Sequence, residues 1–180
     1  MPRPKPHAEL RLERFLPYRL SVLSNRISQD IANLYSERFG LGITEWRVMA
    51  VLGQQSPLSA NTVAERTAMD KVAVSRAVSN LLGKKYLLRQ VDGNDRRRSA
   101  LKLSAKGYTV FDQIVPLALD IEGRILSVLP ESEQRHLLAI LDKLEAAELA
   151  LKDYGLCASA DTRHLLRVAQ HSGRLFQTQE

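Results

Sequence analysis

The chain has 180 residues, of which 44% are hydrophobic and 26% charged, a balance typical of a globular protein that excludes wholesale disorder. Its formal net charge of +6 favours a polyanionic partner, and this charge is unevenly placed. Residues 58–106 carry 11 Lys and Arg against 4 Asp and Glu, a net +7, whereas residues 1–57 carry +3 and residues 107–180 carry −4. The basic character is therefore concentrated in the middle of the chain.

The single cysteine, Cys157, excludes an intramolecular disulfide, so nothing in the cysteine content requires secretion. Residues 1–14 are polar and rich in proline, without the apolar segment of a signal peptide. No apolar run approaches the length of a membrane span. These features predict a cytoplasmic protein with no membrane partner. Residues 1–9 are expected to form a flexible tail.

An amphipathic helical pattern begins at Ala8 and continues to about Phe39, with Gly40 placed to cap its C-terminus. Pro17 lies inside this pattern and predicts either a kink or a fresh helix start. The apolar positions recur mostly at three- and four-residue steps: Leu12, Phe15, Leu16, Leu20, Leu23, Ile27, Ile31 and Leu34. A second helix is expected to begin with Thr44 as its N-cap and to end near Gly53.

Two short helices follow. Ser59 is expected to cap the first, over residues 60–67, and Asp70 the second, over residues 71–82. One face of the second helix is apolar: Val74, Ala77, Val78, Leu81 and Leu82. The opposite face has no acidic side chain to repel phosphate: Val72, Ser75, Arg76 and Ser79. Such a pair is typical of a helix-turn-helix, whose second helix enters the major groove of DNA, although similar pairs also serve as plain packing units.

Residues 86–91 and 99–103 predict two short strands around a loop in which Gly93 and Asn94 suit a turn. A β-hairpin after a helix-turn-helix is a wing, and its tip can reach the minor groove, where negative potential favours inserted arginine. The tip sequence DGNDRRR ends in three consecutive arginines: Arg96, Arg97 and Arg98. Because these like charges repel one another, a polyanionic partner explains them better than a solvated turn does.

Two longer helices complete the pattern. Ser104 is expected to cap the first, which continues to about Val128, and Pro116 inside it predicts a kink or two consecutive helices. Pro130 ends this run, and the last helix opens at Glu131 or the next residue and continues to about residue 152. The apolar stripes of these helices and of the first exceed what one small lobe covers, which predicts a second copy of the chain as partner.

The order of elements and three segments resemble the MarR family of bacterial winged helix-turn-helix transcriptional regulators, over about residues 10–151. The segments are ITEWRVMAVL, VAVSRAVSNLLGKKYLLR and DGNDRRRSALKLSAKG. Asp95 and Arg97 match the Asp-x-Arg pattern of the family's wing. Leu103, Ser104 and Gly107 match the Leu-Ser/Thr-x-x-Gly start of its next helix.

This resemblance implies a mainly α fold with a small β wing, assembled as an obligate homodimer of roughly triangular shape. Residues 41–103 would form the winged helix-turn-helix DNA-binding domain. Residues 10–40 and 104–152 would form a helical dimerisation region, and residues 153–180 a partly ordered extension. It also implies that Asp95 orients Arg97, and that the dimer binds a pseudo-palindromic operator, with repression as the family's default.

The candidate DNA contacts divide by role. Major-groove candidates lie on the second helix of the pair: Lys71, Val72, Ser75, Arg76 and Ser79. Ser59, Asn61 and Lys71 are candidates to hold phosphates, which position the protein without specifying sequence. The wing candidates, with Arg97 in the minor groove and its neighbours on the backbone, are Asp95, Arg96, Arg97 and Arg98.

Many members of this family are released from DNA by a small ligand, often an aromatic acid. The resemblance implies a pocket near Trp46 that could take such an acid or its CoA thioester. The candidate lining residues are Arg19, Leu20, Leu23, Trp46, Arg47 and Phe111, in which an arginine would pair with the carboxylate. The competing interpretation is that the apolar members of this set are ordinary core.

Other functions have weaker support. The sequence has no Gly-rich phosphate loop, nucleophile elbow or paired catalytic carboxylates, so an enzyme is not expected, and no cofactor is predicted. A helical protein-interaction module, using the winged helix for partner docking, stays open as an alternative. Cys157 could be a redox switch, and together with His164 and His171 it could share a helix face as a metal site. The redox pattern is weak because family members that sense peroxide place their cysteine near the start of the first helix. The metal pattern is weak because Gly155 and Gly173 disfavour the helix that it needs.

Overall fold

The computed structural model describes residues 8–91 and 99–153. By its internal contacts the chain divides into two units, Met1–Ile125 and Leu126–Glu180. The elements in order are α1 (Leu16–Phe39), α2 (Ile43–Gln54), α3 (Ala60–Thr67), α4 (Lys71–Gly83), β1 (Leu87–Val91), β2 (Ser99–Leu103), α5 (Ala105–Leu126) and α6 (Glu131–Asp153). This is the mainly helical fold with a small two-stranded wing that the sequence predicts.

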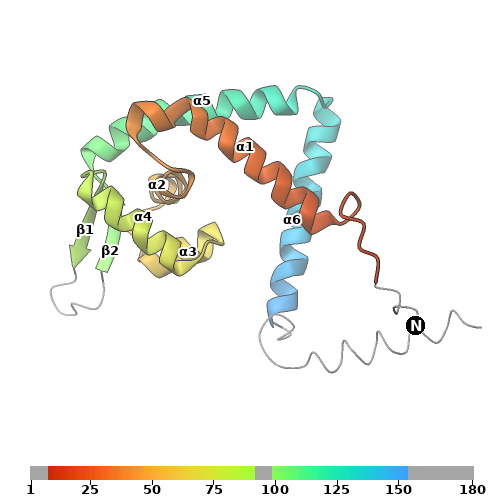
Figure 1. Cartoon of the computed structure of the whole chain (residues 1–180), viewed down its shortest axis with the longest axis horizontal. Helices are drawn as coiled ribbons and strands as arrows, with labels where there is room; N and C mark the ends of the chain where they lie inside the picture. The colour runs from red at the N-terminus through yellow and green to blue at the C-terminus, as the bar shows by residue number, and fades with distance from the viewer. Residues whose placement is uncertain (1–7, 92–98, 154–180) are drawn as a thin grey trace, which may run out of the picture. The chain divides into compact units, whose positions relative to one another are not determined.

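The buried core lies within the first unit and is built where α2 packs against α3 and α4, and α4 against β1. Three helices and the hairpin are gathered closely in this part of the chain (Figure 1). Among the described residues, every buried hydrophobic side chain lies between Ala32 and Ile114. The first half of α1, the second half of α5 and α6 therefore contribute none.

Several predicted helix ends are confirmed by their caps. Gly40 follows α1 in the left-handed conformation, with φ of 63°, and its N–H donates to the Ser36 carbonyl at 2.8 Å. The Ser59 hydroxyl accepts from the Thr62 N–H at 3.1 Å at the start of α3. The Asp70 carboxylate accepts from two N–H groups at the start of α4.

The fresh helix start predicted at Pro17 is confirmed: α1 begins at Leu16, so Pro17 lies in the first turn, where its missing N–H needs no partner. The predicted cap of α2 is wrong, because Gly42 rather than Thr44 is the N-cap and Glu45 satisfies its N–H. α5 is a single helix through Pro116, which contradicts the alternative of two consecutive helices.

α5 can continue through Pro116 because this proline lies on the exposed side of the helix. Pro116 lacks the N–H that would bond the carbonyl of Asp112, one turn earlier. Both residues lie on the exposed side of the helix, so water can satisfy that carbonyl.

The wing strands pair antiparallel, with Leu87 opposite Leu103 and Val91 opposite Ser99. Leu58, just before α3, adds a third backbone segment: it exchanges two hydrogen bonds with Leu101, at 3.0 and 2.7 Å. This bridge ties the base of the wing to the helix-turn-helix, and the sequence pattern did not predict it.

Ser104 joins the base of the wing to α5. Its N–H donates to the Tyr86 carbonyl at 2.9 Å, and its hydroxyl donates to the Lys85 carbonyl at 2.7 Å and accepts from the Gly107 N–H at 2.9 Å. A Cβ atom on Gly107 would lie 2.1 Å from the Tyr86 carbonyl oxygen. The Ser-x-x-Gly pattern therefore reflects both a helix cap and a close approach of two backbones.

The second unit contains the α5–α6 turn and α6. The Gln134 amide donates to the carbonyls of Leu126 and Leu129, at 3.1 and 2.9 Å, and thereby closes the turn. Several large hydrophobic side chains of this unit are exposed: Val128, Leu137, Leu138, Ile140 and Leu144. In the part of the chain that the structure describes, no helix combines the length and the apolar character needed to cross a membrane.

Tyr35 is a core residue of α1 with an unusual hydroxyl. Its ring is 1% exposed and stacks at a tilt on Trp46, with 5.8 Å between the ring centroids. The hydroxyl has no hydrogen-bond partner among the described residues. Burial, above all, raises the pKa of Tyr35 from 10.0 to about 12; the Glu45 carboxylate adds to this rise and the Arg47 guanidinium opposes it.

We expect Tyr35→Phe to raise the free energy of unfolding by about 1 kcal/mol, because it removes a buried polar group that lacks a partner. In the unsubstituted protein the unfolded tyrosine ionises at pH 10.0 and the folded one at about 12, so stability is full below pH 10 and falls as the pH rises through 12. The phenylalanine variant should lack this loss. Urea unfolding of both proteins between pH 7 and the alkaline limit measures it, and a destabilised variant at pH 7 would show that the hydroxyl is satisfied.

Candidate DNA-binding surface

α4 separates its two faces as the sequence predicts. Its buried face is Val74, Ala77, Val78 and Leu81. The predicted outer face is exposed throughout: Val72, Ser75, Arg76 and Ser79. The Val72 side chain is 57% exposed and does not pack into the core. The free face thus combines an apolar contact, two hydroxyls and one guanidinium.

α3 and its N-cap lie on the same helix-turn-helix. Asn61 and Lys71 are exposed, at the first turns of α3 and α4. The Ser59 hydroxyl contacts Thr62 Oγ1 at 2.9 Å as well as the backbone. Ala68, in the turn between the helices, is left-handed with φ of 51°, which lets the three-residue connection close.

Arg76 also borders a shallow hollow beside the first turn of α2. The hollow is lined by Gly42, Ile43, Thr44, Glu45, Ala73, Arg76, Ala77 and Asn80. The helix dipole favours an anion at this end of α2, but the Gly42 N–H already donates to the Glu45 carboxylate, which lines the same hollow. Arg76 is therefore the group of this hollow that can hold a phosphate.

The predicted wing tip, residues 92–98, lies outside the described residues, and with it Asp95, Arg96, Arg97 and Arg98. The extension with Cys157, His164 and His171 also lies outside them. Within the described ranges, no three His, Cys, Asp or Glu side chains gather as a metal site.

The candidate effector residues divide into two groups. Arg19, Leu20 and Leu23 line an open hollow along α1 that Leu16, Tyr18, Val22 and Arg26 complete. Trp46 instead lies between Tyr35 and Phe111, with 5.8 Å between ring centroids on each side. The Arg47 guanidinium donates to the Ser28 hydroxyl at 2.8 Å. The α1 hollow includes none of Trp46, Arg47 and Phe111.

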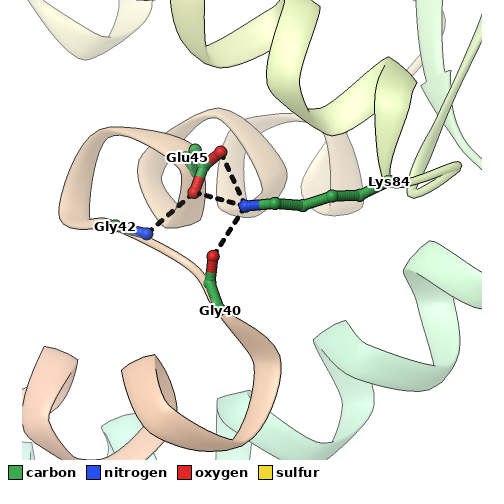
Figure 2. A network of polar contacts seen from close by, with 4 residues as sticks. All are labelled: Gly40, Gly42, Glu45 and Lys84. Carbon is green, nitrogen blue, oxygen red and sulfur yellow. Dashed lines mark hydrogen bonds and ion pairs between the residues drawn. The ribbon is translucent and has the colours of Figure 1, made fainter.

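Sequence analysis missed a polar network where α1, α2 and α4 meet (Figure 2). Glu45 is 7% exposed, and one carboxylate oxygen accepts from the Gly42 N–H at 2.8 Å. The Lys84 ammonium lies 2.9 and 3.0 Å from the two oxygens and 2.6 Å from the Gly40 carbonyl oxygen. The spacing of Gly42 and Glu45 is that of a capping box, which could have indicated half of this network.

Two comparisons place this arrangement among known proteins. Residues 39–98, from the end of α1 to the wing tip, match the model of the MarR family. The fold also matches a MarR/EmrR-family regulator from Acinetobacter sp. ADP1, with a TM-score of 0.70 and 29% identity over 77% of this chain and 97% of that one. Residues 39–98 and the fold are therefore those of the MarR family of transcriptional regulators.

Further relatives agree with this assignment. The HTH-type transcriptional regulator BilQ of Clostridium symbiosum is 27% identical over 124 residues, 67% of this chain and 85% of BilQ. The crystal structure of the S. aureus MepR–DNA complex matches with a TM-score of 0.65 and 25% identity, over 74% of this chain and 98% of MepR. These matches, all to transcriptional regulators and none to an enzyme, support a DNA-binding transcriptional regulator.

Proposed function

We propose that this MarR-family regulator is a homodimer that binds a pseudo-palindromic operator and represses transcription. The observation that carries the proposal is the outer face of α4, which is exposed, free of acidic side chains and placed on the segment that matches the family. Two-fold symmetry would set the two α4 helices about one turn of DNA apart, on the order of 34 Å.

The distribution of apolar surface supports the homodimer. Large hydrophobic side chains stay exposed on α1 and just before it: Leu10, Leu12, Phe15, Leu16, Tyr18, Leu20 and Leu23. Leu119 and Ile125 of α5 are exposed as well. Exposed apolar surface on this scale is typical of an interface. We therefore assign dimerisation to residues 10–40 and 104–152, and DNA binding to residues 41–103.

The proposed DNA contacts follow from side-chain chemistry. Val72 would contact a thymine methyl group, and Ser75 and Ser79 would donate to base edges or phosphates. Arg76 would pair with a guanine or with a phosphate beside the start of α2. Ser59, Asn61 and Lys71 would hold phosphates, and the wing, from Asp95 to Arg98, would enter the minor groove with Arg97.

We expect Arg76→Ala to weaken binding to the DNA that the protein selects from a random duplex library by about 1–3 kcal/mol. If Arg76 reads a guanine, a repeat selection with the variant should lose the preference for that base. If it holds a phosphate, all sequences should weaken equally and the salt dependence should fall by about one charge.

Arg11→Ala is the matched control, because Arg11 is exposed, lies before α1 and pairs with Glu9 at 2.8 Å. It removes the same charge away from α4 and should leave binding within about twofold. Unchanged binding by Arg76→Ala would contradict the assignment of α4. If the protein selects no DNA from the library at all, the proposed function as a whole fails.

We propose further that a small aromatic acid, or its CoA thioester, releases the protein from DNA. What supports this is the family, together with the stack of Tyr35, Trp46 and Phe111, which joins α1, α2 and α5. A ligand that displaced one of these rings would move α2 relative to α1. Adding such acids and thioesters to the same binding assay tests the idea, and binding that none of them changes contradicts it.

A further inference from the structure

We propose that Glu45 and Lys84 are positioning residues that fix the orientation of α4 relative to α1, and thereby the separation of the two half-sites that the dimer accepts. The inference deepens the proposed function and rests on its homodimer. Neither residue lies on the outer face of α4, so the role is distinct from contacting DNA.

The connection between α1 and α2 is where such a constraint is needed. It consists of three residues, of which Gly40 and Gly42 are glycines with wide backbone freedom. Leu41 between them is buried and anchors the connection, but one apolar contact does not by itself define an angle.

The Lys84 ammonium spans this connection. It is bound at once to the Gly40 carbonyl, at the end of α1, and to the Glu45 carboxylate, in the first turn of α2 (Figure 2). Lys84 is itself the C-cap of α4, and its carbonyl accepts from the Lys106 ammonium of α5 at 3.1 Å. One side chain therefore joins the ends of three helices, and its backbone is held by a fourth.

The Glu45 carboxylate is the more buried partner of this ion pair. The Glu45 side chain is 9% exposed and that of Lys84 35%, so the carboxylate depends on its protein donors more than the ammonium does. Charge-assisted hydrogen bonds of this length are strongly directional. If α4 rotated away from α1, the carboxylate would lose two contacts without gaining water.

The test uses the full chain and duplexes that carry two copies of the half-site selected by the unsubstituted protein, with their separation varied in steps of one base pair. We expect the unsubstituted protein to prefer one separation sharply. Lys84→Met should bind that duplex about tenfold more weakly, yet bind a single half-site nearly as well, because the contacts of α4 are unchanged. Its preference for one separation should flatten.

Lys85→Met is the control, since it removes the same charge from the neighbouring exposed residue. It should keep the sharp preference. A Lys84→Met protein that also keeps it, or that loses single-site and two-site binding equally, overturns the inference. An unsubstituted protein without any preferred separation overturns the homodimeric function and the inference together.

Glu45→Gln provides a second variant in case Lys84→Met does not fold. The amide keeps the size and one acceptor oxygen and leaves no unpaired buried charge. We expect an intermediate flattening of the preference. The distance between nitroxide labels at Ser79→Cys in the two subunits, in a Cys157→Ser background, should broaden in both variants, and an unchanged distribution overturns the inference.

Discussion

Replacing Gly107 with alanine is expected to lower the free energy of unfolding by about 3 kcal/mol, although alanine is the better helix former. The reason is the close approach of two backbones: the new Cβ would lie 2.1 Å from the Tyr86 carbonyl oxygen. That oxygen already accepts from the Ser104 N–H at 2.9 Å, so it cannot move without breaking this hydrogen bond just before α5. Urea unfolding followed by Trp46 fluorescence measures the change.

Gly123→Ala is the matched control within the same helix. No heavy atom outside its immediate helix neighbourhood lies within 4 Å of a Cβ built at Gly123. Helix propensity alone then decides, and stability should rise by about 0.5–1 kcal/mol. The two substitutions are chemically identical and should have opposite signs. If Gly107→Ala also stabilised the protein, that result would contradict the close approach of Gly107 to the Tyr86 carbonyl.

Replacing Leu23 with glutamate is expected to separate the proposed homodimer into monomers. Leu23 is 55% exposed and lies on the α1 hollow, so a subunit interface there would have to desolvate the new carboxylate. Pairing with Arg19 or Arg26 of the same hollow does not recover that cost, because desolvation of a buried ion pair can exceed its Coulombic gain. The dissociation constant of the dimer should rise by about 100-fold or more, and affinity for a duplex with two half-sites should fall with it. Sedimentation over a concentration series and a gel shift measure the two effects.

Asn25→Glu adds the same charge to an exposed position of α1 outside that hollow and should leave the dimer intact. The fold of each subunit should survive in Leu23→Glu, because every buried hydrophobic residue in the described ranges comes from positions 32–114. If the Leu23→Glu protein stayed dimeric, the subunit interface would not include this part of α1.

Local features of the chain were predictable because their causes are local. Ser59 and Asp70 each bond an N–H within three residues, and Gly40 takes the left-handed conformation that ends α1. The two faces of α4 follow from its 3.6-residue period. The helix-turn-helix and both wing strands were therefore predicted from sequence to within about a residue or two.

Predictions failed where a residue's environment comes from elsewhere in the fold. Thr44 has the right chemistry for a cap, but Glu45 bonds the Gly42 N–H instead and is held by a lysine 39 residues away. Pro116 was expected to kink α5 or to divide it into two helices. The second alternative is wrong, because the missing hydrogen bond falls on the exposed side of the helix. The six candidate effector residues, which the family resemblance implied, stay a prediction, although they lie in two groups and not around one hollow.

The class of this protein could be predicted from the amino-acid sequence, because the helix-turn-helix with its wing, the basic middle of the chain and the surplus of apolar stripes all follow from short-range pattern and composition. The close approach at Gly107 and the contacts of Lys84 are visible only in three dimensions. Both depend on contacts between segments that are distant along the chain, Tyr86 with α5 in one case and the ends of α1, α2 and α4 in the other. The periodicity of apolar residues predicts which face of a helix is buried, but it does not predict which residues of other elements contact that face.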